Sequence, residues 1–237
     1  MYDRGRKLGK EAAKSGVRLL IDAEQVRYQP AIDNLVLELQ RQFNVGDKPI
    51  IYNTYQCYLR DSPERLRTDV ARSERFNYHF GAKLVRGAYM ETERELAASL
   101  DLEDPIHPTI EMTHKCYDDS VDYLLRHSTE SDLKVEVMCA SHNQASIVNA
   151  IESMNLYGID RSASTICFAQ LYGMSDQLVS NYIAPLMLMF DLQMANENRP
   201  RGRIFNLDSH YLFFYFFLHG RIFLQSGSID RYTASLR

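Results

Sequence analysis

Five short apolar segments alternate with longer amphipathic segments along the chain up to Gln170. The apolar segments are rich in Val, Ile, Leu and aromatic residues. Most of them lack the strict alternation of apolar and polar residues that marks a strand with one solvent-exposed face. This pattern is typical of strands that are covered on both faces. It predicts strands at Val17–Ile21, Pro49–Tyr55, Phe80–Val85, Leu133–Ala140 and Thr165–Ala169.

Amphipathic helices are predicted between these strands. Apolar side chains recur at helical spacing in Pro30–Phe43, Thr109–Leu125 and Asn143–Met154, so each segment can cover one face of a sheet. Because strand and helix alternate, we expect a parallel sheet. The predicted fold class is α/β, with a (β/α)8 TIM-like barrel as the leading architecture and an open doubly wound sheet as the alternative.

The barrel is predicted to be incomplete in this chain. A complete barrel takes roughly 250 residues and eight strands, whereas the pattern supports only the segments given above. Residues 1–177 are therefore predicted to form a partial barrel domain, and 178–237 a divergent tail of unassigned structure. The apolar run Tyr211–Leu218 in the tail is too short to span a bilayer, which takes about 20 apolar residues.

Polar side chains gather at the ends of the predicted strands, where α/β folds place their ligand-binding groups. The polar residues at or just after these ends are Asp22, Glu24, Gln56, Lys83, Arg86, His142 and Gln170. Cations such as Lys83 and Arg86 can stabilise a pyrophosphate or the negative charge of a reduced flavin. The amides at the strand-to-helix junction beside His142 favour anions. The structural alternatives are a capping acid, a lysine paired with a structural acid and a hydrogen-bonded structural histidine.

Composition narrows the class of protein. Of the 237 residues, 45% are hydrophobic and 24% are charged, which is typical of a globular domain. The net charge of -4 argues against a nucleic-acid binder, which usually carries a basic stripe. The four cysteines form no C-x-x-C motif, so we expect reduced, buried thiols. Met1–Lys14 lacks the apolar core of a secretory signal and contains acids that transit peptides avoid, so no targeting segment is predicted.

Several familiar chemistries have no supporting motif. The sequence contains no P-loop, no G-x-G-x-x-G, no H-E-x-x-H and no G-x-S-x-G. Glu111 and His114 have the i, i+3 spacing of a dinuclear carboxylate site, but the second copy that such a site needs is missing. We therefore expect these two residues on a solvated surface, and we expect no metal.

The strand-end segments together carry a family resemblance. They are Leu20–Gln25, Asn53–Leu59, Gly81–Tyr89, Ala140–Asn143 and Gln170–Met174. In this order and spacing they resemble proline dehydrogenase of the eukaryotic mitochondrial type, over roughly Gly9 to Gln177. The resemblance implies a distorted (β/α)8 barrel that holds FAD and oxidises L-proline to 1-pyrroline-5-carboxylate by hydride transfer. This is the first step of proline catabolism to glutamate, and the electrons pass to ubiquinone at the matrix side of the inner mitochondrial membrane.

The resemblance also implies roles for individual residues. The positions matching the family's cofactor-binding residues are Gln56, Lys83, Arg86, Gly87, His142 and Gln170. Asp22 and Tyr89 match positions that face the substrate, and together with Lys83 they are the expected catalytic residues. No nucleophile or metal is needed for such a reaction, because the protein must mainly position flavin and substrate and tune the charge around the ring.

Parts of the family pattern have no match in this sequence. Members carry a late helix with adjacent arginines that grip the proline carboxylate, and Arg199, Arg201 and Arg203 lie in a loop pattern instead. Early barrel strands are also unmatched. We therefore expect impaired proline turnover by this chain. Two alternatives stay open: a non-catalytic truncated module that pairs through an open barrel edge, and a Schiff-base lyase that uses Lys83.

Overall fold

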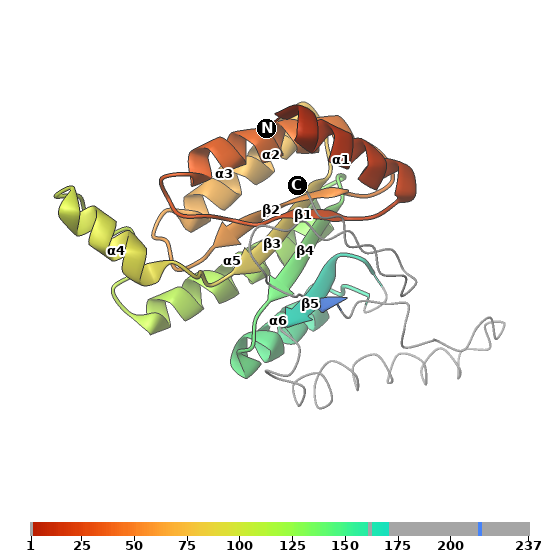
Figure 1. The fold of residues 1–237 in the computed structure, drawn as a ribbon. Helices are drawn as coiled ribbons and strands as arrows, with labels where there is room; N and C mark the ends of the chain where they lie inside the picture. The colour runs from red at the N-terminus through yellow and green to blue at the C-terminus, as the bar shows by residue number, and fades with distance from the viewer. Residues whose placement is uncertain (1, 161–162, 171–212, 215–237) are drawn as a thin grey trace.

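The computed structural model describes residues 2–160, 163–170 and 213–214 of the chain. These residues form one parallel sheet in which the strands follow one another in sequence order (Figure 1). The strands are β1 (Leu19–Ile21), β2 (Ile51–Gln56), β3 (Phe80–Val85), β4 (Val135–Ala140), β5 (Ile166–Gln170) and β6 (Phe213–Phe214). All five predicted strands are confirmed.

The strand order decides between the two predicted architectures. A doubly wound sheet reverses its strand order at a switch point, whereas here every strand lies beside its neighbour in sequence. The sheet curls into part of a barrel, and three helices pack against strands β2 to β4: α2 (Gln29–Phe43), α3 (Ser62–Phe76) and α5 (Ile110–Glu130). The described residues thus form an incomplete (β/α)8 TIM-like barrel, as the sequence predicts.

Within the described ranges, six helices precede or connect the strands β1 to β5. They are α1 (Tyr2–Ser15), α2 (Gln29–Phe43), α3 (Ser62–Phe76), α4 (Met90–Ser99), α5 (Ile110–Glu130) and α6 (Gln144–Leu156). The three predicted helices correspond to α2, α5 and α6. The sequence pattern missed α1, α3 and α4 because their apolar stripes are thin: α3 buries only Leu66 and Val70 among its apolar side chains. None of the helices in the described ranges is long and apolar enough to cross a bilayer.

Local signals set where the two helices nearest the site begin. The Asn143 side chain caps α6 by accepting a hydrogen bond from the Ser146 amide at 3.1 Å. The Thr109 hydroxyl caps α5 in the same way, accepting from the Met112 amide at 3.3 Å. A side-chain oxygen at this position satisfies one of the amides that a helix start leaves unpaired.

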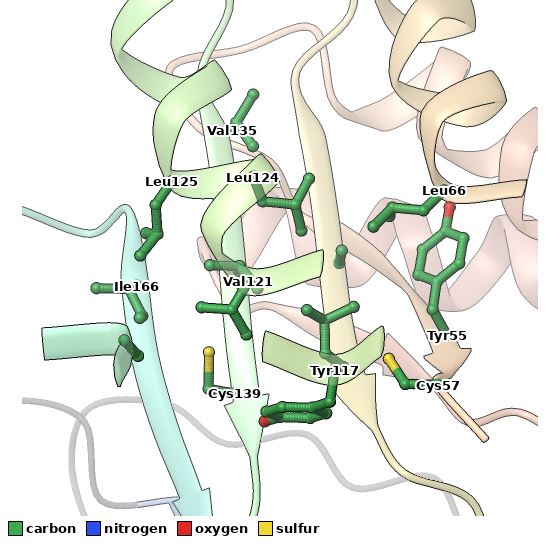
Figure 2. Packing of buried hydrophobic residues seen from close by; sticks show 14 of the residues in the cluster. Tyr55, Cys57, Leu66, Tyr117, Val121, Leu124, Leu125, Val135, Cys139 and Ile166 are labelled. Atoms are coloured by element: carbon green, nitrogen blue, oxygen red, sulfur yellow. The ribbon is translucent and has the colours of Figure 1, made fainter. Parts of the chain in front are cut away.

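The main core lies between the sheet and its helices (Figure 2). Tyr55, Leu84 and Val137 from the strands pack with Val121 and Leu124 from α5, and all are nearly inaccessible to solvent. Because side chains alternate along a strand, the neighbours of these residues face the barrel interior. In β2, Thr54 and Gln56 accordingly line an interior cavity while Tyr55 joins the core. The core thus fixes which side chains enter the site.

A buried polar network connects β2 and β4 with residues that lie just before β1 and β5. Arg18 donates from Nε to Tyr52 Oη and to Glu136 Oε2, each at 2.8 Å, and Tyr52 also donates to Glu136. Ser164 donates to the other Glu136 oxygen at 2.7 Å. A buried ion pair is stable only when its remaining polar atoms are satisfied, and this network meets that requirement.

Most of the predicted tail, 178–237, lies outside the described residues. Phe213 and Phe214, which belong to the apolar run of the tail, form β6 and pair in parallel with Ala169 and Gln170 of β5. The predicted division of the chain into domains at 177 stays a prediction.

Candidate active site

One cavity of about 570 Å³ lies at the carboxyl ends of the strands. This volume lies within the range of roughly 300–1,000 Å³ that small-molecule sites occupy. Its walls include all eight residues that the sequence analysis proposed for the site, which are Asp22, Gln56, Lys83, Arg86, Gly87, Tyr89, His142 and Gln170. The strand ends of a parallel sheet converge at one edge, which is why residues so far apart in sequence meet here.

Lys83 places a cation in the cavity wall. Its Nζ donates to Asp22 Oδ1 at 2.7 Å, and its side chain is only 7% exposed whereas that of Asp22 is 42% exposed. A buried ammonium needs a partner of opposite charge, and Asp22 supplies it from the loop after β1. The Schiff-base alternative that uses Lys83 stays a prediction.

The guanidinium group of Arg86 donates three hydrogen bonds and packs one face against an aromatic ring. Its Nε donates to His114 Nδ1 at 2.9 Å, one Nη donates to Ser141 Oγ at 2.7 Å and the other to Ser146 Oγ at 2.8 Å. The guanidinium carbon also lies 4.5 Å from the centre of the Tyr117 ring, within range of a cation–π contact. These contacts fix the orientation of the cation at the start of α6.

The start of α6 adds donors next to Arg86. Asn143 caps the helix, and its own amide donates to Ser141 Oγ at 3.1 Å. His142 lies between these two residues and is exposed in the cavity wall. Amides at a helix start favour negative charge, so this end of the cavity suits an anionic group.

Tyr89 and Gln56 meet at Glu24. The Tyr89 hydroxyl donates to Glu24 Oε1 at 2.9 Å, and Gln56 Nε2 donates to the Glu24 backbone oxygen at 2.9 Å. Desolvation, followed by the hydrogen bond and the negative charge of Glu24, raises the pKa of Tyr89 to about 12. Tyr89 is therefore a protonated donor at neutral pH.

Gly87 lets the chain turn directly after Arg86. Its φ of +137° lies in the region that side chains disfavour, and a Cβ there would lie 2.2 Å from the ring of Tyr58. The Tyr58 amide donates to the Arg86 oxygen at 2.7 Å, which keeps the two segments close. No other residue type fits this position.

Gln170 offers a donor that nothing in the described part of the chain accepts. It is the last residue of β5 and lines the cavity, yet its Nε2 is buried and has no hydrogen-bond partner among the described residues. Buried polar groups in native proteins are nearly always satisfied. A ligand acceptor in the cavity is a natural partner for this amide.

The prediction for His114 is wrong. Glu111 is exposed, as expected of a solvated surface, but His114 lines the cavity and binds Arg86. A signal was present in the sequence, because His114 lies one turn before Tyr117 on the buried stripe of α5. Within the described ranges, no cluster of three or more metal-binding side chains occurs.

Sequence comparison places the chain in a family. A family model described as proline dehydrogenase matches residues 4–194. The chain belongs to the proline dehydrogenase family. It is 46% identical over 178 residues to human mitochondrial proline dehydrogenase 1, a match that covers 75% of this chain and 29% of that protein. The Drosophila melanogaster enzyme of the same name is 43% identical over 71% of this chain and 26% of its own length.

A further relative has a different name. Hydroxyproline dehydrogenase from Xenopus laevis is 37% identical over 73% of this chain and 37% of that protein. The chain spans less than a third of the length of the human and fly relatives.

Solved structures show the same fold. Proline utilization A from Bdellovibrio bacteriovorus, inactivated by N-propargylglycine, superposes with a TM-score of 0.70 at 22% identity, covering 78% of this chain and 19% of that protein. The Corynebacterium freiburgense protein gives 0.66 at 24% identity, over 75% and 18%. At such identities the likeness supports the fold and not the details of the site.

Proposed function

We propose that this chain carries the flavin-binding part of a proline-oxidising site. The reaction is the FAD-dependent oxidation of L-proline to 1-pyrroline-5-carboxylate, and ubiquinone is the electron acceptor. The observation that carries the proposal is the convergence of all eight candidate residues on one cavity, with two oriented cations in its wall. The human and fly relatives are named mitochondrial, which supports a mitochondrial location for this protein. A position at the matrix side of the inner membrane is part of the proposal and rests on the family resemblance alone.

The residues present suit FAD. The Gln170 amide, which has no hydrogen-bond partner among the described residues, offers a donor to a polar ring edge. The residues proposed to hold the cofactor are Gln56, Lys83, Arg86, Gly87, His142 and Gln170. When bound, FAD supplies the acceptor for the hydride that leaves the carbon beside the proline nitrogen.

The protein's own groups then position substrate and balance charge. Lys83 keeps a positive charge in a wall that is shielded from water, where it stabilises negative charge better than in bulk solvent. Asp22 exposes a carboxylate beside it, which suits the ammonium group of an amino acid. Tyr89 stays protonated and donates to Glu24, so this side of the mouth is held by a neutral donor.

A second candidate function is a non-catalytic module that pairs with another chain. The observation that favours it is the outer edge of β1, which has no strand partner among the described residues. An exposed edge of this kind can accept a strand from another chain. Flavin-free protein that assembles with a longer family member would favour this alternative.

The test of the proposed function is the visible spectrum of the full chain after reconstitution with FAD, followed by anaerobic addition of L-proline. The expected result is bound flavin that L-proline bleaches more slowly than it bleaches the flavin of a full-length family member, because the carboxylate clamp is unmatched, and that D-proline does not bleach. Bound flavin that is not bleached would place the defect in substrate binding. A folded chain that binds no flavin would contradict the proposal.

A further inference from the structure

His114 makes a contact that its place in a surface-like sequence did not predict. It lies in the second turn of α5, lines the cavity and accepts a hydrogen bond at Nδ1 from Arg86 Nε. An imidazole that accepts at Nδ1 is neutral and carries its proton on Nε2. The side chain thus acts on the cation through a ring nitrogen that can only accept.

The three partners of Arg86 differ in how firmly they fix it. Ser141 and Ser146 are hydroxyls, which rotate and can both donate and accept. His114 is a flat ring on a helix, so its Nδ1 acceptor points in one direction. Together with the face of Tyr117, it sets the plane of the guanidinium.

This arrangement leaves defined donors for a ligand. A guanidinium carries five N–H donors, and the described residues use three of them, so five minus three leaves two. All three contacts come from the sides of the cavity formed by α5 and the start of α6. The direction of the two remaining donors therefore depends on the plane that His114 fixes.

We propose that His114 is a positioning residue for Arg86. It holds the guanidinium so that the two remaining N–H donors meet the flavin dinucleotide, and this role rests on the proposed function. His114 acts through Arg86 and not by contact with the reacting atoms. The alternative roles, a direct ligand of the cofactor or a simple packing residue, give different results in the tests below.

The first test compares three variants by their dissociation constant for FAD, measured from flavin fluorescence. His114→Leu keeps the bulk but removes the acceptor, and we expect affinity to fall roughly ten- to hundredfold, the size of a hydrogen bond to a charged group. His114→Asn places an oxygen acceptor near the Nδ1 position and should remain within about threefold of the parent. The matched control is His127→Leu, at the far end of the same helix and paired with Glu74, which should leave FAD affinity unchanged.

A double-mutant cycle separates positioning from packing. A lysine cannot make the three hydrogen bonds that Arg86 makes with His114, Ser141 and Ser146. In the Arg86→Lys background, His114→Leu should therefore weaken FAD binding by less than about threefold. An undiminished loss in that background would overturn the proposal. So would a His114→Asn variant as weak as His114→Leu.

A second measurement needs no flavin. In 15N-labelled protein, the Arg86 Nε–H signal, assigned by its loss in Arg86→Lys, should exchange slowly with water in the parent and in His114→Asn and quickly in His114→Leu. If the parent binds no FAD, the proposed function fails while this signal still decides whether His114 holds Arg86. An Nε–H signal that His114→Leu does not change would overturn the inference.

Discussion

Gly87 shows how one residue shapes the site. It follows Arg86 directly and adopts a positive φ under the ring of Tyr58, so the turn depends on the absence of a side chain. This turn also determines the position of Arg86, which directly follows the end of β3. A substitution there therefore affects both stability and the cavity.

We expect Gly87→Ala to lower the free energy of unfolding by about 1–3 kcal/mol, because it adds both backbone strain and a clash. The matched control is Gly158→Ala, which has a φ of +65° but no atom within 4 Å of the added Cβ. Urea denaturation should show a larger loss for Gly87→Ala than for the control. Equal losses would mean that the contact with Tyr58 does not matter.

The contact between Tyr89 and Glu24 can be tested through the dependence of stability on pH. Its pKa of about 12 in the folded protein exceeds the usual value of 10.0, so the folded state holds the phenol proton more tightly than the unfolded state does. The stability that Tyr89 contributes is therefore complete below pH 10 and is lost as the pH rises from 10 to 12. We expect Tyr89→Phe to lose less stability than the parent over this window, as measured by urea denaturation at each pH. A parallel decline of the two proteins would contradict the contact with Glu24.

Sequence could predict residues that lie on or after strands, because a strand's end fixes where its polar groups go. Asp22, Lys83 and Gln170 were found in this way. His114 and Ser146 were missed because they come from helices, and their approach to Arg86 depends on how α5 and α6 pack on the sheet. The spacing of His114 to Tyr117 within α5 could indicate that His114 is partly buried, but it could not show which residue of another element His114 contacts.

At the scale of elements, the start of α6 links helix stability to the site. Asn143 caps the helix while Ser141 and Ser146, on either side of it, hold Arg86. A loosened cap should therefore disturb the partners of the cation. The cap of α5, formed by Thr109, binds neither serine and offers a comparison.

We expect Asn143→Ala and Thr109→Ala each to lower the free energy of unfolding by about 1 kcal/mol through the loss of a cap. Asn143→Ala alone should also weaken FAD binding. The measurements are thermal unfolding and fluorescence titration of the two variants. The same FAD affinity in both would show that the cap does not position the serines.

The elements themselves were predicted where their apolar patterns were strong. Helix α5 buries Val121, Leu124 and Leu125 on one stripe, whereas α1 and α3 have mostly polar surfaces that resemble loops in sequence. The strands in the structure begin or end up to two residues away from the predicted bounds. Gln56 and Gln170, which were predicted to come just after their strands, are the last residues of β2 and β5. Hydrogen-bond pairing with a neighbouring strand decides such bounds, and single-strand patterns do not contain it.

At the scale of the molecule, the Arg18–Glu136 network joins β1 to β4 across the barrel interior. Only the folded sheet brings these residues together, since 118 positions separate them. Removal of one residue of a buried ion pair leaves the other charge unpaired, which strongly lowers the stability of the fold. Replacement of both residues with apolar ones is often tolerated.

We expect Glu136→Gln to lower the free energy of unfolding by roughly 3–5 kcal/mol. The double variant Arg18→Met with Glu136→Leu should lose less than the single variant, because no unpaired charge remains. Denaturation in urea of the parent and both variants measures this difference. A double variant that loses as much stability as Glu136→Gln, or more, would contradict the pairing.

We propose that the cavity at the strand ends binds FAD through Lys83 and Arg86. This binding can be measured by calorimetric titration of the full chain with FAD, beside the variant Arg86→Ala, with circular dichroism to establish that both proteins are folded. We expect one FAD per chain in the parent and at least tenfold weaker binding in the variant. Folded parent protein that takes up no FAD, or a variant that binds as well as the parent, would contradict it.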